Sequence, residues 1–546
     1  GIIESIPDKD IIKINPGYSN TYFISYKKDT IFSFQSESQE KIQINFHGIN
    51  CNFDINFNGK IMNQINLDTY SIEINSTNNN ITITPLIDVI NGKYKENYEQ
   101  KSCPLSINSY IIKDKPNLKI ENKEENIIYF EPSNFNILNI LYNIKNITFD
   151  SFVALSFQFK QKTNFSINVT YKNDNNEINS IYKNISDSSY IYLNSEDLLF
   201  NNETDIDISG ILSINIENKN EKAINFRFKI IEKDTISLIE KDSLTFGFIT
   251  SKTIYQYYYT EIFKKEEGEL ILHNKRLYGV LHGKIINKND IKKEDLYNIS
   301  TYPNETWNET NSEYLNYNQH LLKLNFSYIN TSNCLDGCYL LITYQQQQSI
   351  GDFPLIGYEY TILSRFWNYT DYISQIIDIP FNEYIIGTFE MGSISHHYYS
   401  IYIPDDAEKI FIQIEDNYLD GFYEEGRKKI NTMKLTDKTN KLELIDNQNV
   451  LTLNVKSLNY SGKAISFAFR SKDYYVDTFS FYYFRILYVR ENETLYFPID
   501  SYFGNLCLPE LDNNTNSYYC NLIFKNNYNE LSTKFVVTSS HQNEYF

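Results

Sequence analysis

The sequence predicts an all-β protein, and three observations support this class. Alanine, the best helix former, occurs five times in 546 residues, while 47 tyrosines, 36 phenylalanines and abundant isoleucine and threonine favour strands. Apolar and polar residues alternate in many short segments, with the period of a half-buried strand. No segment carries an apolar stripe at helical spacing over more than three turns. An AT-rich genome, such as that of a protist, would also supply much Asn, Ile, Lys and Tyr, but it does not account for the alternation.

The alternating segments occur along the whole chain. In KIQINFHG, for example, Ile42, Ile44 and Phe46 fall on one face of the expected strand. The same pattern recurs in ITITPLI (81–87), FSINVTY (165–171), ELILHN (269–274) and KIFIQIED (409–416). Strands of this kind predict antiparallel sheets that have one buried face.

One pair of long segments predicts an internal repeat. The segment 247–279 aligns with 387–421 at a shift of about 140 residues, which is the size of a domain. The alignment places Tyr258 and Tyr259 on Tyr398 and Tyr399, and Leu270 and Leu272 on Ile410 and Ile412. In both segments an acidic turn, KKEEGE or PDDAEK, separates the two strands, so we expect a hairpin there.

The ends of the repeats predict where the units meet. INFRFKIIEKD (224–234), YEYTILSRFWN (358–368) and FYYFRILYVREN (481–492) each read as a long closing strand that runs into a charged turn. We therefore expect antiparallel β-sandwiches arranged as beads at 1–112, 113–233, 234–368 and 369–490. Residues 491–546 read as the start of an incomplete further unit of a longer polypeptide.

The repeated pattern resembles a known family. A glycine (Gly387), an aromatic strand, an acidic turn (405–409) and an alternating strand resemble the pre-peptidase C-terminal family of β-sandwich domains, and more distantly CUB-like sandwiches. The residues that carry the resemblance within the strands are Tyr398, Tyr399, Ile401, Ile403, Ile410, Ile412 and Ile414. It covers about half of each unit and implies a non-catalytic accessory or binding module. The aspartate-rich strand that usually follows in the family is matched only by CNFDINFNG (51–59).

The cysteines indicate an oxidising compartment. They form three local pairs, Cys51 with Cys103, Cys334 with Cys338, and Cys507 with Cys520, which predict disulfides. A zinc site is the alternative, but C-x₃-C without a second Cys or His pair nearby fits zinc spacing poorly.

Glycosylation sequons point to the same compartment. About sixteen Asn-x-Ser/Thr sequons occur, against roughly eleven expected by chance in a chain so rich in asparagine. Three of them lie in the polar stretch NISTYPNETWNET, which reads as an exposed loop. The predicted glycosylation sites are Asn75, Asn80, Asn146, Asn164, Asn168, Asn184, Asn202, Asn298, Asn304, Asn308, Asn325, Asn330, Asn368, Asn459, Asn492 and Asn513. We therefore expect a secreted or cell-surface protein, either a mature form after signal removal or a fragment. No apolar run approaches the roughly 18 residues of a membrane span.

The sequence offers no catalytic or cofactor-binding constellation. His396 and His397 are adjacent, so they point to opposite faces of a strand and cannot chelate one metal; we expect them to face solvent or a sheet edge. The carboxylates Asp405, Asp406 and Glu408 read as a solvated turn, with Ca²⁺ binding as the alternative. Neither G-x-S-x-G nor G-x-G-x-x-G is present. The net charge of −19 without a basic patch argues against nucleic-acid binding.

Two aromatic clusters allow two interpretations. YQYYYTEIF (255–263) and YYVDTFSFYYF (474–484) form either sandwich core with cross-strand ladders or an exposed stripe for sugars and proteins. We expect a non-enzymatic structural or adhesive glycoprotein, such as a coat, fibre or adhesin arm. It would contact copies of itself or other surface glycoproteins through edge strands. The alternative is an accessory carbohydrate- or protein-binding region of a secreted hydrolase.

Overall fold

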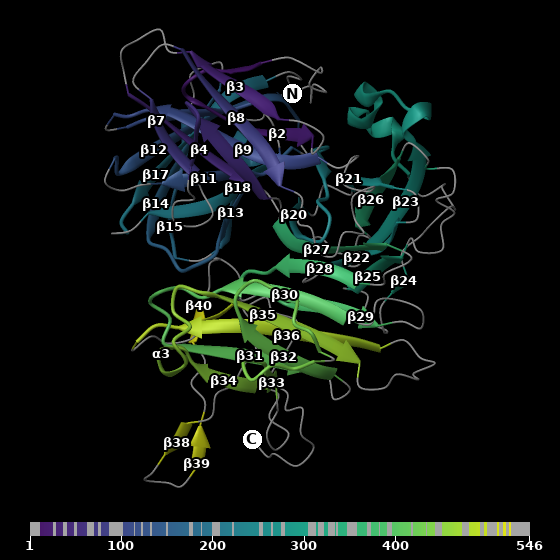
Figure 1. Cartoon of the computed structure of the whole chain (residues 1–546). Helices are drawn as coiled ribbons and strands as arrows, with labels where there is room; N and C mark the ends of the chain where they lie inside the picture. Colours follow the sequence, from purple (N-terminus) through teal and green to yellow (C-terminus); the bar gives the residue numbers. More distant parts are fainter. Residues whose placement is uncertain are drawn as a thin grey trace.

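The computed structural model shows an all-β chain, as predicted (Figure 1). It describes residues 11–25, 29–35, 41–48, 52–62, 70–74, 78–86, 102–113, 115–121, 124–130, 134–148, 151–173, 178–186, 188–198, 208–220, 223–250, 255–263, 266–274, 279–303, 313–314, 321–325, 334, 337–346, 357–368, 373–381, 383–389, 396–415, 419–432, 434–442, 450–471, 480–491, 496–498, 510–512, 517–519 and 523–525. None of the helices in this part of the chain has the length and apolar character needed to cross a membrane.

The strands form pairs of sheets in which one topology recurs. We call each copy a unit. In every unit the first and third strands, counted along the chain, pair in parallel, and we call the sheet that contains this pair the mixed sheet. The other sheet, in which every pairing is antiparallel, is the antiparallel sheet. The repeat predicted from the sequence is therefore present in the structure.

The first unit comprises β1 to β9. Its mixed sheet has the order β1 (Ile12–Ile14), β3 (Thr30–Gln35), β8 (Asn78–Leu86), β5 (Asn52–Phe57) and β6 (Lys60–Ile61). Its antiparallel sheet has the order β2 (Tyr18–Ser25), β9 (Ser102–Ile111), β4 (Ile42–Gly48) and β7 (Tyr70–Ile74). Side chains of both sheets, including Phe34, Phe46 and Leu105, share one core.

The second unit comprises β10 to β18 and follows the same order. Its mixed sheet runs β10 (Asn117–Ile120), β12 (Ile137–Ile147), β17 (Ile208–Asn218), β14 (Phe165–Asn173) and β15 (Ile178–Ile185). Its antiparallel sheet runs β11 (Asn126–Phe130), β18 (Ile224–Glu232), β13 (Val153–Phe159) and β16 (Ser189–Leu193), and the short helix α2 (Ser195–Leu198) follows β16.

The third unit comprises β19 to β27. Its mixed sheet runs β19 (Ile236–Leu238), β21 (Tyr255–Ile262), β26 (Cys338–Gln346) and β23 (Gly279–Asn287). Its antiparallel sheet runs β20 (Leu244–Thr250), β27 (Gly357–Asn368), β22 (Glu266–Asn274), β25 (Leu321–Asn325) and β24 (Glu313–Tyr314). Three 3₁₀ turns follow β23: η1 (Lys288–Asp290), η2 (Lys293–Tyr297) and η3 (Ile299–Thr301).

The fourth unit comprises β28 to β36. Its mixed sheet runs β28 (Ile373–Asp378), β30 (His396–Tyr402), β35 (Ala464–Ser471), β32 (Leu419–Glu425) and β33 (Asn440–Leu442). Its antiparallel sheet runs β29 (Ile385–Phe389), β36 (Ser480–Val489), β31 (Lys409–Glu415) and β34 (Val450–Asn454), and the helix α3 (Val455–Leu458) follows β34. Four more strands lie beyond it: β37 (Tyr496–Pro498), β38 (Glu510–Asp512), β39 (Ser517–Tyr519) and β40 (Ile523–Lys525).

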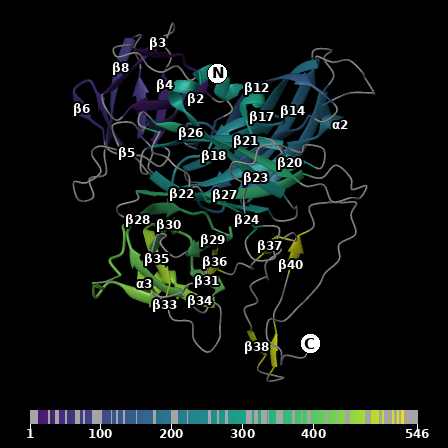
Figure 2. The same ribbon diagram turned by 90° about the vertical axis from the view of Figure 1, so that its right-hand side faces the viewer.

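The units are not separate beads, which corrects the predicted arrangement. A parallel pairing of β2 with β10 joins the first antiparallel sheet to the second mixed sheet, so one nine-stranded sheet crosses the expected boundary at residue 112. One apolar cluster also contains Ala154, Phe248 and Tyr399, which belong to the second, third and fourth units. In both ribbon views the fourth unit lies against the third-unit strands β22 and β27 (Figures 1 and 2). Alternation along a strand reports burial on one face only, and so the sequence did not reveal these contacts.

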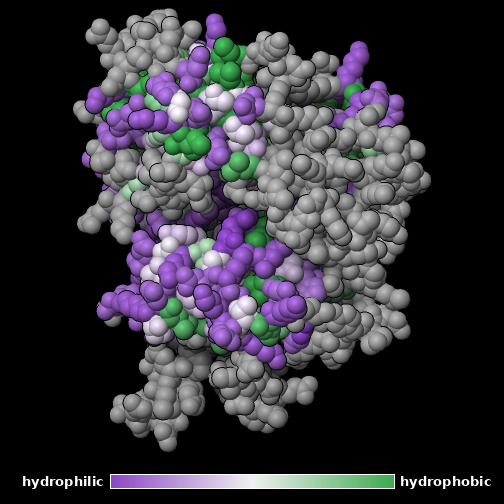
Figure 3. Space-filling view, viewed as in Figure 1, coloured by the Kyte–Doolittle hydropathy of each residue, from purple (hydrophilic) through white to green (hydrophobic). Residues whose placement is uncertain are grey.

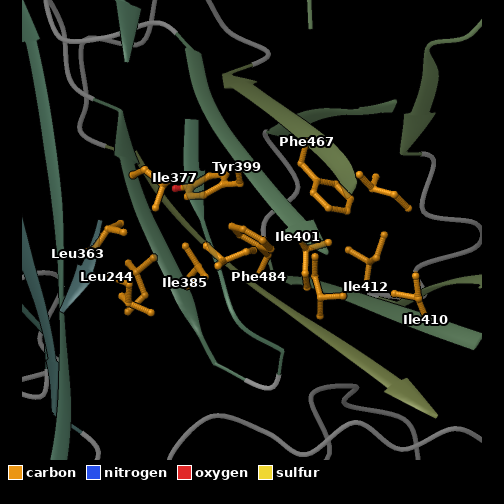
Figure 4. Close-up of a cluster of buried hydrophobic side chains, with 14 of the residues drawn as sticks. Leu244, Leu363, Ile377, Ile385, Tyr399, Ile401, Ile410, Ile412, Phe467 and Phe484 are labelled. Atoms are coloured by element: carbon orange, nitrogen blue, oxygen red, sulfur yellow. The ribbon is translucent and has the colours of Figure 1, made fainter. Parts of the chain in front are cut away.

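The acidic turn at 405–409 is not a hairpin, which is a second correction. The strand before it, β30, belongs to the mixed sheet, and the strand after it, β31, belongs to the antiparallel sheet. The turn therefore carries the chain from one sheet to the other. Between them lies the fourth-unit core, in which Tyr399 and Ile401 from β30 meet Ile410 and Ile412 from β31 (Figure 4).

Candidate functional site: the buried joint between the third and fourth units

Three charged side chains lie on the face of the third antiparallel sheet that meets the fourth unit. Leu270 and Leu272 of β22 point into the third-unit core, so Glu269, which precedes Leu270 on the same strand, points to the opposite face. Arg365 of β27 stands directly across the ladder from Glu269, and Lys323 lies on the next strand, β25. All three side chains are almost completely buried: the exposed fractions are 4% for Glu269, 1% for Arg365 and 2% for Lys323.

These three residues form a buried ion triplet. Lys323 Nζ lies 3.1 Å from Glu269 Oε2, and Arg365 Nη1 lies 3.0 Å from Glu269 Oε1. The hydroxyl of Thr388, on β29 of the fourth unit, donates to Glu269 Oε2 at 2.8 Å and accepts from Lys323 at 3.0 Å. Burial alone would raise the pKa of Glu269, but the two cations and the hydroxyl hold that pKa below its ordinary value.

His397 completes the joint from the fourth unit. Its imidazole is fully buried and stacks on Phe389, with ring centroids 4.3 Å apart. Its Nε2 lies 3.3 Å from Arg365 Nη1, and its Nδ1 lies 2.6 Å from the hydroxyl of Tyr482. Because a guanidinium can only donate, Nε2 accepts and Nδ1–H donates to Tyr482. Burial, and then the charges of Arg365 and Lys323, lower the pKa of His397 well below its ordinary value.

Two tyrosines connect this imidazole to the guanidinium. Arg365 Nη2 donates to the hydroxyl of Tyr399, which lies 2.9 Å from the hydroxyl of Tyr482. The Tyr482 ring crosses over Gly387, where a Cβ would come within 2.2 Å of the ring. Gly387, the first residue of the repeated motif, thus leaves space for the Tyr482 ring, whose hydroxyl contacts His397 and Tyr399.

The positions of the two histidines correct one expectation and confirm another. Their side chains lie on opposite faces of β30, as predicted: His397 shares its face with Tyr399, and His396 stacks on Tyr398 and lies 2.7 Å from Thr432 Oγ1. Neither lies at a sheet edge, because β30 is an interior strand. His397 does not face solvent, since the third unit buries it, whereas His396 is half-buried. The residues that cover His397 come from distant parts of the sequence, and no local pattern indicated them.

A second charged group lies where the first three units meet. A recess there is lined by Glu124, Glu125, Arg227, Lys229 and Glu240. Arg227 pairs with Glu125 at 3.4 Å. Burial, followed by the charge of Glu125, raises the pKa of Glu240 to about 8, while burial lowers the pKa of Lys229. The folded environment therefore favours the protonated form of Glu240, and no pattern in the sequence indicated this.

The aromatic cluster at 255–263 is core on both of its faces in the described structure. Tyr258 packs in the third-unit core, while Tyr257 and Tyr259 pack beneath the 3₁₀ turns with Leu296 and Tyr302. The exposed-stripe interpretation is therefore wrong for this cluster. In the second cluster, at 474–484, the residues up to Phe479 lie outside the described part of the chain.

The acidic turn has exposed carboxylates. Asp405 and Asp406 are exposed, and Asp406 pairs with Arg490. Within the part of the chain that the structure describes, no three His, Cys, Asp or Glu side chains are placed to hold a metal ion. In the view of Figure 3 the described surface is mainly hydrophilic, with scattered apolar residues.

Of the three predicted cysteine pairs, the described residues show one in full. Cys334 and Cys338 form a disulfide. Cys103 is disulfide-bonded and fully buried, while Cys51, Cys507 and Cys520 lie outside the described residues.

The predicted glycosylation sites fall into four groups. Five sequon asparagines have exposed side chains: Asn80, Asn164, Asn184, Asn298 and Asn459. Asn168 is half-buried. Asn146, Asn325 and Asn368 lie on strands but their side chains are not described, and Asn75, Asn202, Asn304, Asn308, Asn330, Asn492 and Asn513 lie outside the described residues.

Comparison with known proteins does not place the chain in a family. No protein-family model matches it, and neither does any curated protein. Among solved structures, the chain is similar to a carbohydrate-binding module of the β-sandwich superfamily, at 8% identity and a TM-score of 0.13, over 39% of this chain and 98% of that chain. It is also similar to the CUB1-EGF-CUB2 domains of rat MASP-1, at 9% identity and a TM-score of 0.12, over 46% of this chain and 100% of that chain. A third match is the full extracellular region of zebrafish Gpr126/Adgrg6, at 7% identity and a TM-score of 0.14, over 64% of this chain and 56% of that chain. These scores are too low to carry an argument about function.

Proposed function

We propose that this chain is a non-catalytic structural or adhesive segment of a secreted or cell-surface glycoprotein. Its role would be to present a stiff, glycosylated surface to copies of itself or to other surface glycoproteins. We infer that the two sheets of each unit form a β-sandwich, with unit boundaries near residues 112, 233, 368 and 490. The observation that supports the proposal best is the joining of the units by a shared sheet, a shared core and the buried joint at His397.

The pairing of β37 with β40 supports the proposal that 491–546 begins a further unit. In the four units the first and third strands pair in parallel, through Ile12 and Phe32, Asn117 and Asn139, Ile236 and Tyr257, and Ile376 and Tyr398. Tyr496 and Ile523 pair in the same parallel manner and at a similar separation along the chain. A repeated series of joined units suits an extended arm or fibre better than it suits an enzyme.

Electron microscopy of native, unreduced material tests the proposal. We expect stiff rods or regular filaments in which successive units keep a fixed angle. Particles with freely bending joints between units would contradict a load-bearing or adhesive arm. That result would favour an accessory binding region of a secreted hydrolase, and glycan-binding assays would then test this alternative.

A further inference from the structure

The strand β15 is one of the two edge strands of the nine-stranded sheet within the described residues, and β7 is the other. It comes first in the strand order, and it pairs with β14 along its length, from Ile178 opposite Lys172 to Ile185 opposite Phe165. The backbone groups on the other side of β15 have no partner strand in the described part of the chain. Such an edge is a template for pairing with a second chain.

This edge lacks the usual protective residues. It contains no proline and only one charged residue, Lys183. The Lys183 ammonium donates to Ser189 Oγ at 3.0 Å and to the Tyr190 carbonyl at 2.8 Å, so its charge is held against its own unit. Two large side chains of the strand face solvent instead: Ile178 is 60% exposed and Tyr182 is 62% exposed. An edge strand with a single charged residue and exposed apolar side chains favours edge-to-edge association.

A sequon lies on this same strand. Asn184, Ile185 and Ser186 form it, and the Asn184 side chain is exposed. Its Oδ1 accepts from Ser166 Oγ at 2.8 Å and from the Tyr182 hydroxyl at 3.1 Å. These two bonds use the carbonyl oxygen, and no hydrogen bond within the described residues involves Nδ2, the atom to which an N-linked glycan is attached.

We propose that Asn184 carries an N-linked glycan that caps the β15 edge and keeps two copies of this chain from pairing through it. A glycan is bulky and strongly hydrated, so at the end of an eight-residue edge strand it obstructs an incoming antiparallel strand. The inference rests on the proposed function, because N-glycosylation requires passage through the secretory pathway. It adds a specific role for one of the predicted sites: control of self-association.

The test uses the full chain secreted from a eukaryotic cell line. Glycopeptide mass spectrometry measures occupancy at each sequon, and analytical ultracentrifugation measures the mass in solution. The variant S186A removes the sequon but keeps Asn184 and both of its hydrogen bonds. We expect an occupied Asn184 and a monomeric wild type, and an S186A protein that self-associates at least about tenfold more tightly.

Two further variants make the result specific. S461A removes the exposed sequon at Asn459 in the fourth unit and should leave the protein monomeric. Adding I178K and Y182K to S186A should restore the monomer, because lysines on an edge strand disfavour pairing. A dimer that persists in this triple variant, or an S186A protein that stays monomeric, would overturn the capping role.

The occupancy data separate the two levels of the argument. An unmodified Asn184 in a protein whose other sequons carry glycans would overturn the capping inference alone. A protein without any glycan would overturn the proposal of a secreted glycoprotein, and the capping inference with it.

Discussion

The imidazole Nε2 of His397 lies 3.3 Å from Nη1 of Arg365, and neither side chain is more than 1% exposed. A neutral imidazole accepts a hydrogen bond from the guanidinium in this geometry, whereas an imidazolium would place a second positive charge against it without solvent between them. The joint between the third and fourth units therefore requires His397 to be uncharged.

The first prediction is that acidification weakens the fold through His397. The pKa of His397 is lower in the folded chain than its ordinary value of 6.5, so the unfolded chain binds the proton more readily. This contribution to stability is complete above pH 6.5 and decreases as pH falls below it, by up to about 1.4 kcal/mol per pH unit. Below pH 4.5, Glu269 adds a loss of the same sign, because its pKa is also lowered.

The variant H397Q isolates the histidine term. Glutamine can still accept from Arg365 and donate to Tyr482, but it does not titrate. Thermal unfolding measured from pH 7.5 to 5 should give a shallower pH dependence for H397Q than for the wild type. H396Q is the matched control. The pKa of the half-buried His396 imidazole is lowered less than that of His397, so the stability of H396Q should depend on pH more nearly as the wild type does. Parallel curves for H397Q and wild type would show that His397 is not the titrating group.

The second prediction concerns Glu240 and has the opposite sign. Its pKa is raised to about 8 in the folded chain, so the folded state holds a proton that the unfolded state releases near pH 4.5. Between pH 4.5 and about 8 this group removes stability as pH rises. We expect E240Q to match the wild type near pH 4.5 and to exceed it in unfolding temperature at pH 8. Equal unfolding temperatures at both pH values would contradict the proton exchange assigned to Glu240.

The third prediction is that removing one charge of the ion triplet lowers the unfolding free energy more than replacing all three charges by apolar residues does. E269Q leaves the buried charges of Lys323 and Arg365 without their anion, and we expect a loss of about 3–5 kcal/mol in unfolding free energy. The triple variant E269L/K323M/R365L removes all three charges and should lose less than E269Q does. Denaturant unfolding measures both. A triple variant that is less stable than E269Q would mean that the triplet stabilises the joint beyond its own desolvation cost.

The fourth prediction concerns the glycine that faces Tyr482. A Cβ at residue 387 would lie 2.2 Å from the Tyr482 ring, so G387A forces the ring out of the joint and should cost about 1–3 kcal/mol or more. The double variant G387A/Y482A removes the clash, and its stability should equal that of Y482A alone. Additive losses in the double variant would mean that the two residues do not interfere.

The sequence was sufficient for the strands but not for their register or their sheets. The closing segments at 224–234, 358–368 and 481–492 are indeed strands, β18, β27 and β36, because long apolar alternation is a local property. The alignment of Tyr258 with Tyr398 was wrong by one residue. Tyr258 and Tyr399 are equivalent: each lies in its unit's core and meets the hydroxyl of a tyrosine, Tyr360 or Tyr482, that stands opposite a glycine. A slip of one residue exchanges the two faces of a strand, and neither segment contains a signal that fixes it.

The contacts that form the joint could not be predicted from the sequence. Glu269, Arg365 and His397 are far apart in the chain, and each of them alone reads as an ordinary polar residue on a strand. Pairing of β22 with β27 brings Glu269 beside Arg365, and only the packing of the third unit on the fourth adds His397 to them. One feature of the sequence does indicate a buried charge: Arg365 lies among the apolar residues of the closing strand β27.

The strand order has a consequence for synthesis on the ribosome. In each unit the last two strands to be made enter the middle of the two sheets: β8 lies between β3 and β5, and β9 lies between β2 and β4. The same holds for β17 and β18, for β26 and β27, and for β35 and β36. A nascent unit therefore holds unpaired strands until its last two strands emerge, one for each sheet, and it can close only as a whole. A ribosome that stalls before the last two strands of a unit are made would leave open strand edges exposed to neighbouring chains.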